Sequence, residues 1–285
     1  MNVRAALAEG SGALGGSSPG SPFLDAALLL GLALGLERDR VLAAMPDEVP
    51  PAALRSYRAY IGRRCSGEPV AYILGYKEFY GRRYSVDPRV LVPRPDTELL
   101  VETALRLLPR PGTSREPRCH DAFTGSGCVG VSIAAERPDV EVSLSDASAD
   151  ALELASANAR ALLGRALDAR EGDVLSAAVG PFDLIVANPP YVTKALTDEL
   201  LLGGDAEPRM ALDGGELGLD LYPDIAAQAY ALLSEGGALA VEIGEEQGEA
   251  VAAIFRGAGF GDVTVHTDLA GSDRVVAGVK HAVRR

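Results

Sequence analysis

The chain has 285 residues, 47% of them hydrophobic, and its 40 Asp and Glu outnumber its 27 Lys and Arg to give a net charge of −13. This length fits one large domain or two smaller ones, with enough apolar residues for a sizeable core. The acidic balance argues against a surface that grips phosphate backbones, because that grip needs clustered Lys and Arg.

The three cysteines and three histidines lack zinc-ligand spacing, so no metal site is expected. An odd cysteine count without a disulfide pattern fits a reducing compartment. The N-terminus has no signal-peptide pattern, and the apolar run at 28–36 is far shorter than the roughly 20 residues that span a bilayer. We therefore expect a cytoplasmic protein that is not bound to a membrane.

Residues 1–75 read as a small helical domain. Within it, residues 9–22 are rich in Gly, Ser and Pro, which predicts a flexible leader or a broken first helix. Ser21 or Asp25 is a candidate cap for the apolar helix that follows. Residues 76–93 alternate as a β-hairpin would, with Gly81 at the turn, and we expect them to link two domains.

From residue 94 to the end, short apolar runs alternate with helical stretches. Apolar segments such as VEVSLSD, FDLIVA and GGALAVEIG alternate with stretches such as CVGVSIAAE and DALELASANARALLG. This order predicts an α/β domain with a mostly parallel sheet. Ligands bind such sheets at the carboxyl ends of the strands, so motifs that directly follow strands are the candidates for function.

A Gly-rich loop, DAFTGSG at 121–127, follows one expected strand and precedes a helix. Its glycines allow a close approach to a ligand, and the helix start offers free N–H groups. Asp146 ends the next expected strand about 20 residues later, where an acidic side chain can bind both hydroxyls of a ribose. Alone, the Gly-rich loop could be an ordinary turn, and Asp146 could be a helix cap. The loop and Asp146 together favour a site for a nucleoside-containing cofactor.

The motif Asn188-Pro189-Pro190-Tyr191 directly follows the strand-like FDLIVA and is the strongest signal in the chain. The two prolines end the strand and stiffen the backbone. The Asn188 side-chain oxygen and the Pro189 carbonyl then form a pair of acceptors that matches the two donors of a planar –NH2 group. Tyr191 can stack on a flat target.

This arrangement suits direct displacement on the sulfonium methyl of S-adenosylmethionine. The donor is already activated, so the difficulty lies in a conjugated and therefore poor nitrogen nucleophile. Two acceptors stabilise positive charge that grows on that nitrogen and hold it in line with the methyl group. The motif alone leaves open whether the nitrogen belongs to an amide or to a nucleic-acid base.

The chain resembles the HemK/PrmC family, the release factor glutamine N5-methyltransferases. The resemblance covers nearly the whole chain and rests on GEPVAYILGYKEFYG, VPRPDTELL, DAFTGSG, NPPY, EPRMALDGGELGLD, VEIGEEQG and GSDRVVAGVK. It implies the fold of a class I S-adenosylmethionine-dependent methyltransferase, Rossmann-like, with an N-terminal helical substrate-recognition domain (1–75), a hairpin linker (76–93) and a catalytic domain (94–285). The implied reaction methylates the glutamine of the Gly-Gly-Gln motif in class I peptide chain release factors. We expect a monomer.

The resemblance also implies roles for individual residues. Asn188 through Tyr191 and Arg94 would bind the glutamine substrate, with Asn188 and Pro189 as the catalytic groups. The residues implied to contact the cofactor are Thr97, Glu98, Phe123, Thr124, Gly125, Ser126, Gly127, Asp146, Val174 and Asn188. The sequence departs from the family at Phe123, where the loop usually has a small residue, at Ala147, usually larger and apolar, and at Val174, often bulkier.

Two other functions compete with this one. A nucleic-acid amino-methyltransferase acting on adenine or guanine would use the same chemistry, but would have to flip a duplex base into the site. That function usually brings a basic face, whereas RSYRAYIGRR at 55–64 is the one basic cluster of the first domain and reads as a solvated helix face. The third possibility is a binding protein that kept the fold and lost the cofactor, which the intact NPPY motif argues against.

Overall fold

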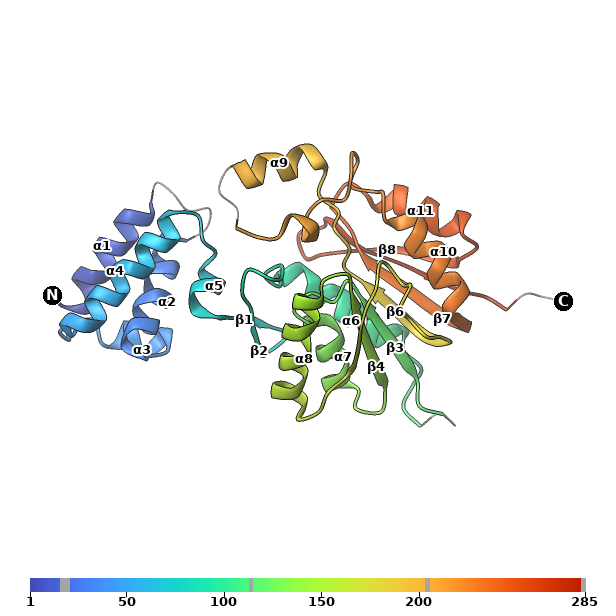
Figure 1. The fold of residues 1–285 in the computed structure, drawn as a ribbon, viewed down its shortest axis with the longest axis horizontal. Coiled ribbons are helices and arrows are strands. Elements are labelled where there is room, and N and C mark those ends of the chain that lie inside the picture. The colour runs from blue at the N-terminus through green and yellow to red at the C-terminus, as the bar shows by residue number, and fades with distance from the viewer. Residues whose placement is uncertain (16–20, 113–114, 203–205, 283–285) are drawn as a thin grey trace. The chain divides into compact units, whose positions relative to one another are not determined.

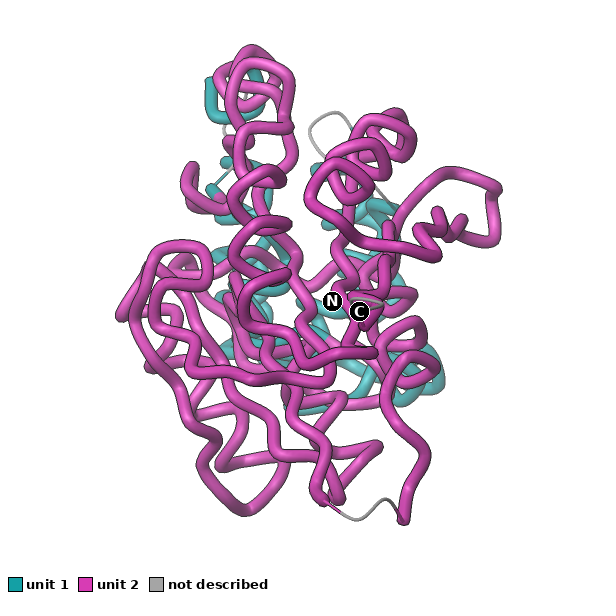
Figure 2. Tube along the Cα trace, turned by 90° about the vertical axis from the view of Figure 1, so that its right-hand side faces the viewer, with its two compact units in different colours: residues 1–77, 199–206 teal, residues 78–198, 207–285 magenta. Residues whose placement is uncertain are grey.

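The computed structural model describes residues 1–15, 21–112, 115–202 and 206–282. The chain divides into two compact units, residues 1–77 with 199–206 and residues 78–198 with 207–285 (Figure 2). None of the helices in these described ranges is long and apolar enough to cross a membrane.

The first unit is helical and has its own core. Its helices are α1 Val3–Leu14, α2 Pro22–Leu34, α3 Arg38–Ala43, α4 Pro51–Cys65 and α5 Val70–Leu74. Leu7, Leu29, Leu30 and Tyr57 are almost completely buried where α1, α2 and α4 pack together. Ser21 caps α2 by accepting a hydrogen bond from the Leu24 N–H at 3.4 Å, as its position in the sequence predicts.

The expectation of a flexible leader is wrong for residues 9–14, which form the last turns of α1. Gly10 lies against Tyr57, and a β-carbon at Gly10 would lie only 1.9 Å from the Tyr57 hydroxyl oxygen. That hydroxyl donates to the Ala6 carbonyl at 3.2 Å. The glycine therefore serves close packing rather than a break. The rest of the expected leader includes residues 16–20, which lie outside the described residues.

The expected hairpin is formed by β1 Tyr76–Phe79 and β2 Arg82–Ser85. Its two turn residues, Tyr80 and Gly81, have φ values of 49° and 71°. Positive φ at both positions is typical of the type I′ turn, whose twist matches that of the flanking strands.

The second unit is an α/β domain. Its strands are β3 Arg118–Ala122, β4 Glu141–Asp146, β5 Asp168–Glu171, β6 Phe182–Ala187, β7 Leu233–Glu242, β8 Gly261–Thr267 and β9 Asp273–Val279. Its helices are η1 Pro95–Thr97, α6 Glu98–Leu107, α7 Cys128–Glu136, α8 Ala149–Leu163, η2 Arg209–Ala211, α10 Tyr222–Leu232 and α11 Gly248–Gly257. Helix α9, Lys194–Leu202, runs across the division between the two units.

The seven strands form one sheet in the order β5-β4-β3-β6-β7-β9-β8. Strands β3 to β7 pair in parallel, and β9 runs antiparallel to both β7 and β8. The predicted mostly parallel sheet is therefore confirmed. The strand order reverses between β3 and β6, and such a switch point opens a crevice at the carboxyl ends of these strands.

Helices cover both faces of this sheet, in three layers (Figure 1). Alternate residues of β6 point to opposite sides, so that Leu184 and Val186 join one core cluster while Ile185 and Ala187 join another. The first cluster includes residues of α6, α7 and α8, and the second includes residues of α10 and α11. Strands buried on both faces read as continuous apolar runs, which is why FDLIVA stood out in the sequence.

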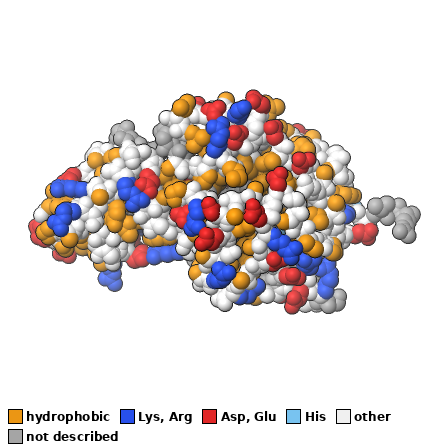
Figure 3. Space-filling view, in the orientation of Figure 1, with side chains coloured by type: hydrophobic (Ala, Val, Ile, Leu, Met, Phe, Trp, Pro, Cys, Tyr) orange, Lys and Arg blue, Asp and Glu red, His pale blue; other side chains and the backbone are white. Residues whose placement is uncertain are grey.

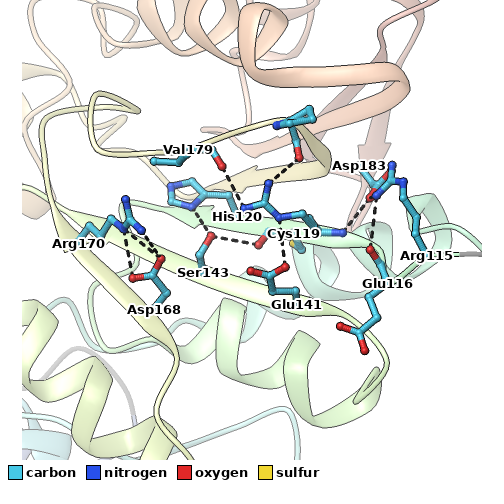
Figure 4. A network of polar contacts seen from close by, with 12 residues as sticks. Arg115, Glu116, Cys119, His120, Glu141, Ser143, Asp168, Arg170, Val179 and Asp183 are labelled. Carbon is cyan, nitrogen blue, oxygen red and sulfur yellow. Dashed lines mark hydrogen bonds and ion pairs between the residues drawn. The ribbon is translucent and has the colours of Figure 1, made fainter.

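Polar contacts join the strands at the amino end of the sheet (Figure 4). Asp183 of β6 accepts hydrogen bonds from the Arg115 side chain and from the Arg118 N–H of β3, both at 2.8 Å. The buried His120 ring contacts Ser143 Oγ of β4 at 2.9 Å, and burial lowers the pKa of His120 to about 4. The network fixes the ends of β3, β4 and β6 that lie opposite the switch-point crevice.

Candidate active site

A cavity of about 810 Å³ lies at the carboxyl ends of β3, β4 and β6, wholly within the second unit. This volume is within the range of about 300–1,000 Å³ that is typical of small-molecule sites. The segments that line it include the loop after β3, the end of β4, the start of α8 and the residue after β6. Among the predicted site residues, the lining contains Arg94, Thr97, Phe123, Thr124, Gly125, Ser126, Asp146, Asn188 and Pro190.

The Gly-rich loop is held in shape by the buried Asp121. One Asp121 carboxyl oxygen accepts from the Thr124 hydroxyl at 2.6 Å and from the Gly130 N–H at 2.8 Å. Gly125 and Gly127 have φ values of 53° and 81°, in the left-handed region that glycine adopts freely. A β-carbon at Gly125 would meet nothing within 4 Å, so the loop presents bare backbone to open space.

Asp146 faces this loop from the end of β4. Its Oδ2 accepts from the Gly125 N–H at 2.8 Å, and its Oδ1 accepts from the Ser148 N–H at 3.0 Å. Burial raises the pKa of Asp146, while these backbone hydrogen bonds lower it. Each carboxylate oxygen can accept more than one hydrogen bond, so both retain capacity for the hydroxyls of a ribose.

Two of the departures from the family pattern have unusual backbone conformations. Phe123 and Val174 have φ values of 57° and 51°, which are rare for residues with large or branched side chains. Phe123 lines the cavity and also packs against the core cluster under α10 and α11. Val174 is buried in that cluster, and it is Asp173 that lines the cavity.

The end of the NPPY motif is held by hydrogen bonds with segments that lie far away in the sequence. Val192 N–H donates to the Leu212 carbonyl at 3.0 Å, and the Gln247 side chain donates to the Tyr191 carbonyl at 3.0 Å. Pro189 is buried, and no hydrogen bond from the described residues reaches its carbonyl oxygen. Pro189 and Tyr191 are not among the lining residues, whereas Asn188 and Pro190 are.

Within the described residues, the Asn188 side chain has one hydrogen-bond partner. Its Nδ2 donates to Thr97 Oγ1 at 3.4 Å. Its Oδ1 accepts no hydrogen bond from the described residues, so it remains available as an acceptor. This is the acceptor that the sequence predicts for a planar –NH2 group.

The remaining predicted residues lie around this centre. Arg94 forms an ion pair with the buried Glu207, which also accepts from the Val92 N–H at 2.8 Å. Gly127 is the N-cap residue of α7 and Glu98 is the first residue of α6, and neither belongs to the cavity lining. Glu98 Oε1 instead accepts from the Tyr80 N–H at 2.8 Å, so it anchors the hairpin turn.

Two residues that support the motif, Gln247 and Glu242, were not predicted from the sequence. Gln247 holds the Tyr191 carbonyl and accepts from the Gly244 N–H at 2.9 Å. Glu242, only 1% exposed, accepts from the Tyr191 hydroxyl at 3.3 Å. A signal for Glu242 was present, because it is a charged residue at the end of the apolar run GGALAV.

These residues fit S-adenosylmethionine. The backbone of the Gly-rich loop lies open beside Asp146, which can take the ribose hydroxyls. The cavity is lined by charges of both signs, which suit a ligand that carries a sulfonium and a carboxylate: Asp146, Asp150, Asp173 and Asp213, with Arg89, Arg94 and Arg209. Among the described residues, no three His, Cys, Asp or Glu side chains form a metal-binding group.

Solved structures with the same fold are methyltransferases. A methyltransferase from Pyrococcus furiosus matches with a TM-score of 0.53 at 17% identity over 78% of this chain and 98% of that chain. The hMettl16 catalytic domain matches with a TM-score of 0.56 at 13% identity over 78% and 82% of the two chains. Residues 96–203 also match the model of the methyltransferase small domain, and residues 5–75 match the PrmC N-terminal domain. Fold and site together define a class I S-adenosylmethionine-dependent methyltransferase.

Closer relatives narrow this class. The release factor glutamine methyltransferase of Moorella thermoacetica is 40% identical over 96% of this chain and 97% of that protein. Those of Bordetella pertussis and Neisseria gonorrhoeae are 43% and 42% identical over 92% and 91% of this chain, and over 96% and 95% of their own lengths. The chain belongs to the release factor glutamine methyltransferase family.

Proposed function

We propose that this enzyme methylates the side-chain amide nitrogen of the glutamine in the Gly-Gly-Gln motif of class I release factors. The observation that carries the proposal is that neither Asn188 Oδ1 nor the Pro189 carbonyl accepts a hydrogen bond from the described residues, while Asn188 and Pro190 line the cavity. A primary amide offers two N–H donors in one plane, which this pair can accept together. The names of the relatives support the same substrate.

Bound S-adenosylmethionine supplies a methyl group already activated on a sulfonium. Asn188 and Pro189 would orient and activate the amide nitrogen. Their oxygens would hold this nitrogen in line with the methyl group. They would also stabilise the positive charge on the nitrogen as the N–C bond forms and the S–C bond breaks. With the electron pair of the broken S–C bond left on the cofactor's sulfur, the extra proton of the amide nitrogen would pass to solvent water and leave a neutral methylamide.

We further propose that residues 1–75 recognise the protein substrate, that residues 76–93 link the domains, and that the enzyme acts as a monomer in the cytoplasm. The match of residues 5–75 to the PrmC N-terminal domain supports the first assignment. The net charge of −13 argues against nucleic acid as the substrate. On the face shown in Figure 3, acidic and basic side chains are interspersed.

The test incubates the enzyme with methyl-labelled S-adenosylmethionine and either a class I release factor, its Gly-Gly-Gln glutamine-to-alanine variant, or DNA and ribosomal RNA. We expect label on the release factor and none on the variant. Label on nucleic acid but not on the release factor would overturn the proposal. Calorimetry without any cofactor binding would point instead to a binding protein that kept the fold.

A further inference from the structure

Two segments of the cavity wall that lie far apart in the sequence meet at one carboxyl group. Residues from 88–94 and from 208–213 line the cavity, and Glu207 directly precedes the second segment. Glu207 Oε1 accepts a hydrogen bond from the Val92 N–H at 2.8 Å, and Oε2 forms an ion pair with Arg94. All of these residues belong to the second unit. Glu207 has no role in the reaction as described so far.

A negative charge at this position carries a cost for the fold. The Glu207 side chain is only 3% exposed, and burial of a carboxylate carries a desolvation cost even when the charge is paired. A glutamine of nearly the same shape would accept equally from the Val92 N–H and would join the two segments without a charge. What the carboxylate adds is an attraction for the Arg94 guanidinium, so the contact with Arg94 explains why a charged residue stands here.

The Arg94 side chain is restrained by this contact before any ligand binds. Arginine has a long stem with many rotamers, and an arginine that becomes ordered only on binding loses this freedom at the expense of affinity. The Glu207 carboxylate is itself fixed by the Val92 backbone, so it gives the Arg94 guanidinium a rigid anchor. A guanidinium carries five N–H donors, and Glu207 is the one hydrogen-bond acceptor that Arg94 has among the described residues. Most of these donors therefore remain available for a ligand.

Arg94 is joined to the catalytic asparagine by two hydrogen bonds in series. The Thr97 N–H donates to the Arg94 carbonyl at 3.1 Å, and Thr97 Oγ1 accepts from Asn188 Nδ2 at 3.4 Å. The Arg94 side chain lines the cavity and is 45% exposed, so its donors can reach a chain that enters from outside. In the proposed substrate, two glycines precede the glutamine, and glycine lets another group approach its backbone closely. The carbonyl oxygens of that backbone are acceptors that match the donors of a guanidinium.

We infer that Glu207 is a positioning residue that holds the Arg94 guanidinium ready to bind main-chain carbonyl oxygens of the protein substrate next to its target glutamine. The inference rests on the proposed function for the identity of this substrate, whereas the restraint on Arg94 is a property of the free enzyme. It extends the substrate site to a residue that does not itself line the cavity.

The first test is the Glu207→Gln substitution with a kinetic readout. The new amide oxygen keeps an acceptor for the Val92 N–H, while the –NH2 group faces Arg94 with donors in place of an acceptor. Because Arg94 is proposed to bind the substrate equally in the ground state and the transition state, the KM for the release factor should rise about tenfold at a nearly unchanged kcat. The Kd of S-adenosylmethionine should stay at the wild-type value.

The second test asks whether Glu207 acts through Arg94. The Arg94→Met substitution removes the guanidinium and should raise the KM for the release factor at least as much as Glu207→Gln does. The double variant should then have the same KM as Arg94→Met alone, because the effects of two residues that act through one contact do not add. Full additivity of the two changes would mean that Glu207 affects the substrate by another route, and it would overturn the inference.

The matched control is the Asp183→Asn substitution. Asp183 also accepts hydrogen bonds from a backbone N–H and from an arginine side chain, those of Arg118 and Arg115, both at 2.8 Å. It lies at the amino end of the sheet, opposite the cavity, and does not belong to the cavity lining. Asp183→Asn should therefore leave the KM for the release factor unchanged.

The third test needs no substrate. In nitrogen-15 relaxation measurements on the free enzyme, the Arg94 guanidinium should be ordered in the wild type and in Asp183→Asn, and more mobile in Glu207→Gln. Equal mobility of Arg94 in all three proteins, or an unchanged KM in Glu207→Gln, would overturn the inference. A higher Kd of S-adenosylmethionine at an unchanged KM for the release factor would also overturn it, by placing Arg94 in the cofactor site. Failure of the proposed function is a separate outcome, in which the wild type transfers no label to a release factor.

Discussion

The Gly125 N–H donates to Asp146 Oδ2 at 2.8 Å, so the cofactor loop after β3 is joined directly to the carboxylate at the end of β4. The Asp146→Ala substitution removes this contact and both acceptors proposed for the ribose. Because hydrogen bonds to a charged group are each worth about 1.5–3 kcal/mol, we expect the Kd of S-adenosylmethionine to rise at least about 10- to 100-fold. Calorimetry measures this change.

The control for that substitution is Asp168→Ala. Asp168 lies on β5, is ion-paired with Arg170 at 2.9 Å and lies outside the cavity lining. The Asp168→Ala substitution removes the same charge from a neighbouring strand and should leave the Kd of S-adenosylmethionine unchanged. Unchanged cofactor binding by Asp146→Ala would remove the ribose assignment.

Removal of the Asn188 side chain should affect the chemical step rather than cofactor binding. Asn188→Ala leaves the Pro189 carbonyl as the one acceptor of the proposed pair, and loss of one preorganised group of this kind costs about 100- to 1,000-fold in kcat. Single-turnover methyl transfer and calorimetry together separate the two effects. Transfer near the wild-type rate would show that the two-acceptor mechanism is wrong.

The contact between α7 and the sheet leaves no space at Gly130. A β-carbon there would lie 2.4 Å from Leu144 Cδ2 and 2.9 Å from Asp121 Oδ2. Gly130→Ala should therefore lower the free energy of unfolding by roughly 1–3 kcal/mol, measured by urea titration. Gly257→Ala, at the end of α11 where a β-carbon meets nothing within 4 Å, is the control and should be neutral or slightly stabilising. Equal stability of the two variants would contradict this account.

The buried Glu242 should make stability depend on pH. Its pKa is raised from 4.5 to about 7 in the native state, so the folded protein keeps a proton that the unfolded chain releases. This stabilisation, up to about 3 kcal/mol, is complete below about pH 4.5 and is lost as the pH rises through about 7.

The Glu242→Gln variant isolates this contribution, because its side chain does not titrate. Relative to the wild type, the variant should gain unfolding free energy between pH 5 and pH 8, as measured by urea titration at each pH. A difference that stays constant with pH would mean that Glu242 is ionised in the native protein throughout this range.

The sequence predicted the parts of the fold that follow from apolar patterning. Strands β6 and β7 are buried and contain apolar runs, and β4 alternates apolar with polar residues, whereas β5, with the sequence DARE, was missed. It is a short edge strand with three exposed residues, so burial imposes no pattern on it. The end of α1 was missed for the opposite reason, since tertiary contact with Tyr57 requires Gly10 where local propensity argues against a helix.

The site residues that belong to short local motifs could be predicted from the sequence. Asp146, the Gly-rich loop and Asn188 come from segments that each follow a strand, and the parallel sheet brings them to one edge. Glu242 and Gln247 act through contacts with residues about 50 positions away, and their own segments carry no sign of those partners.

The backbone of Phe123, beside the cofactor cavity, is in a strained conformation. At a φ of 57°, a residue with a β-carbon is strained by about 1–2 kcal/mol relative to glycine. In exchange, an aromatic ring fills the space between the cavity and the core beneath it. Phe123→Gly would relax the backbone and widen the cavity at the same time. Thermostability and a closely fitted ligand site are therefore opposed at this one position, and selection for either would act against the other.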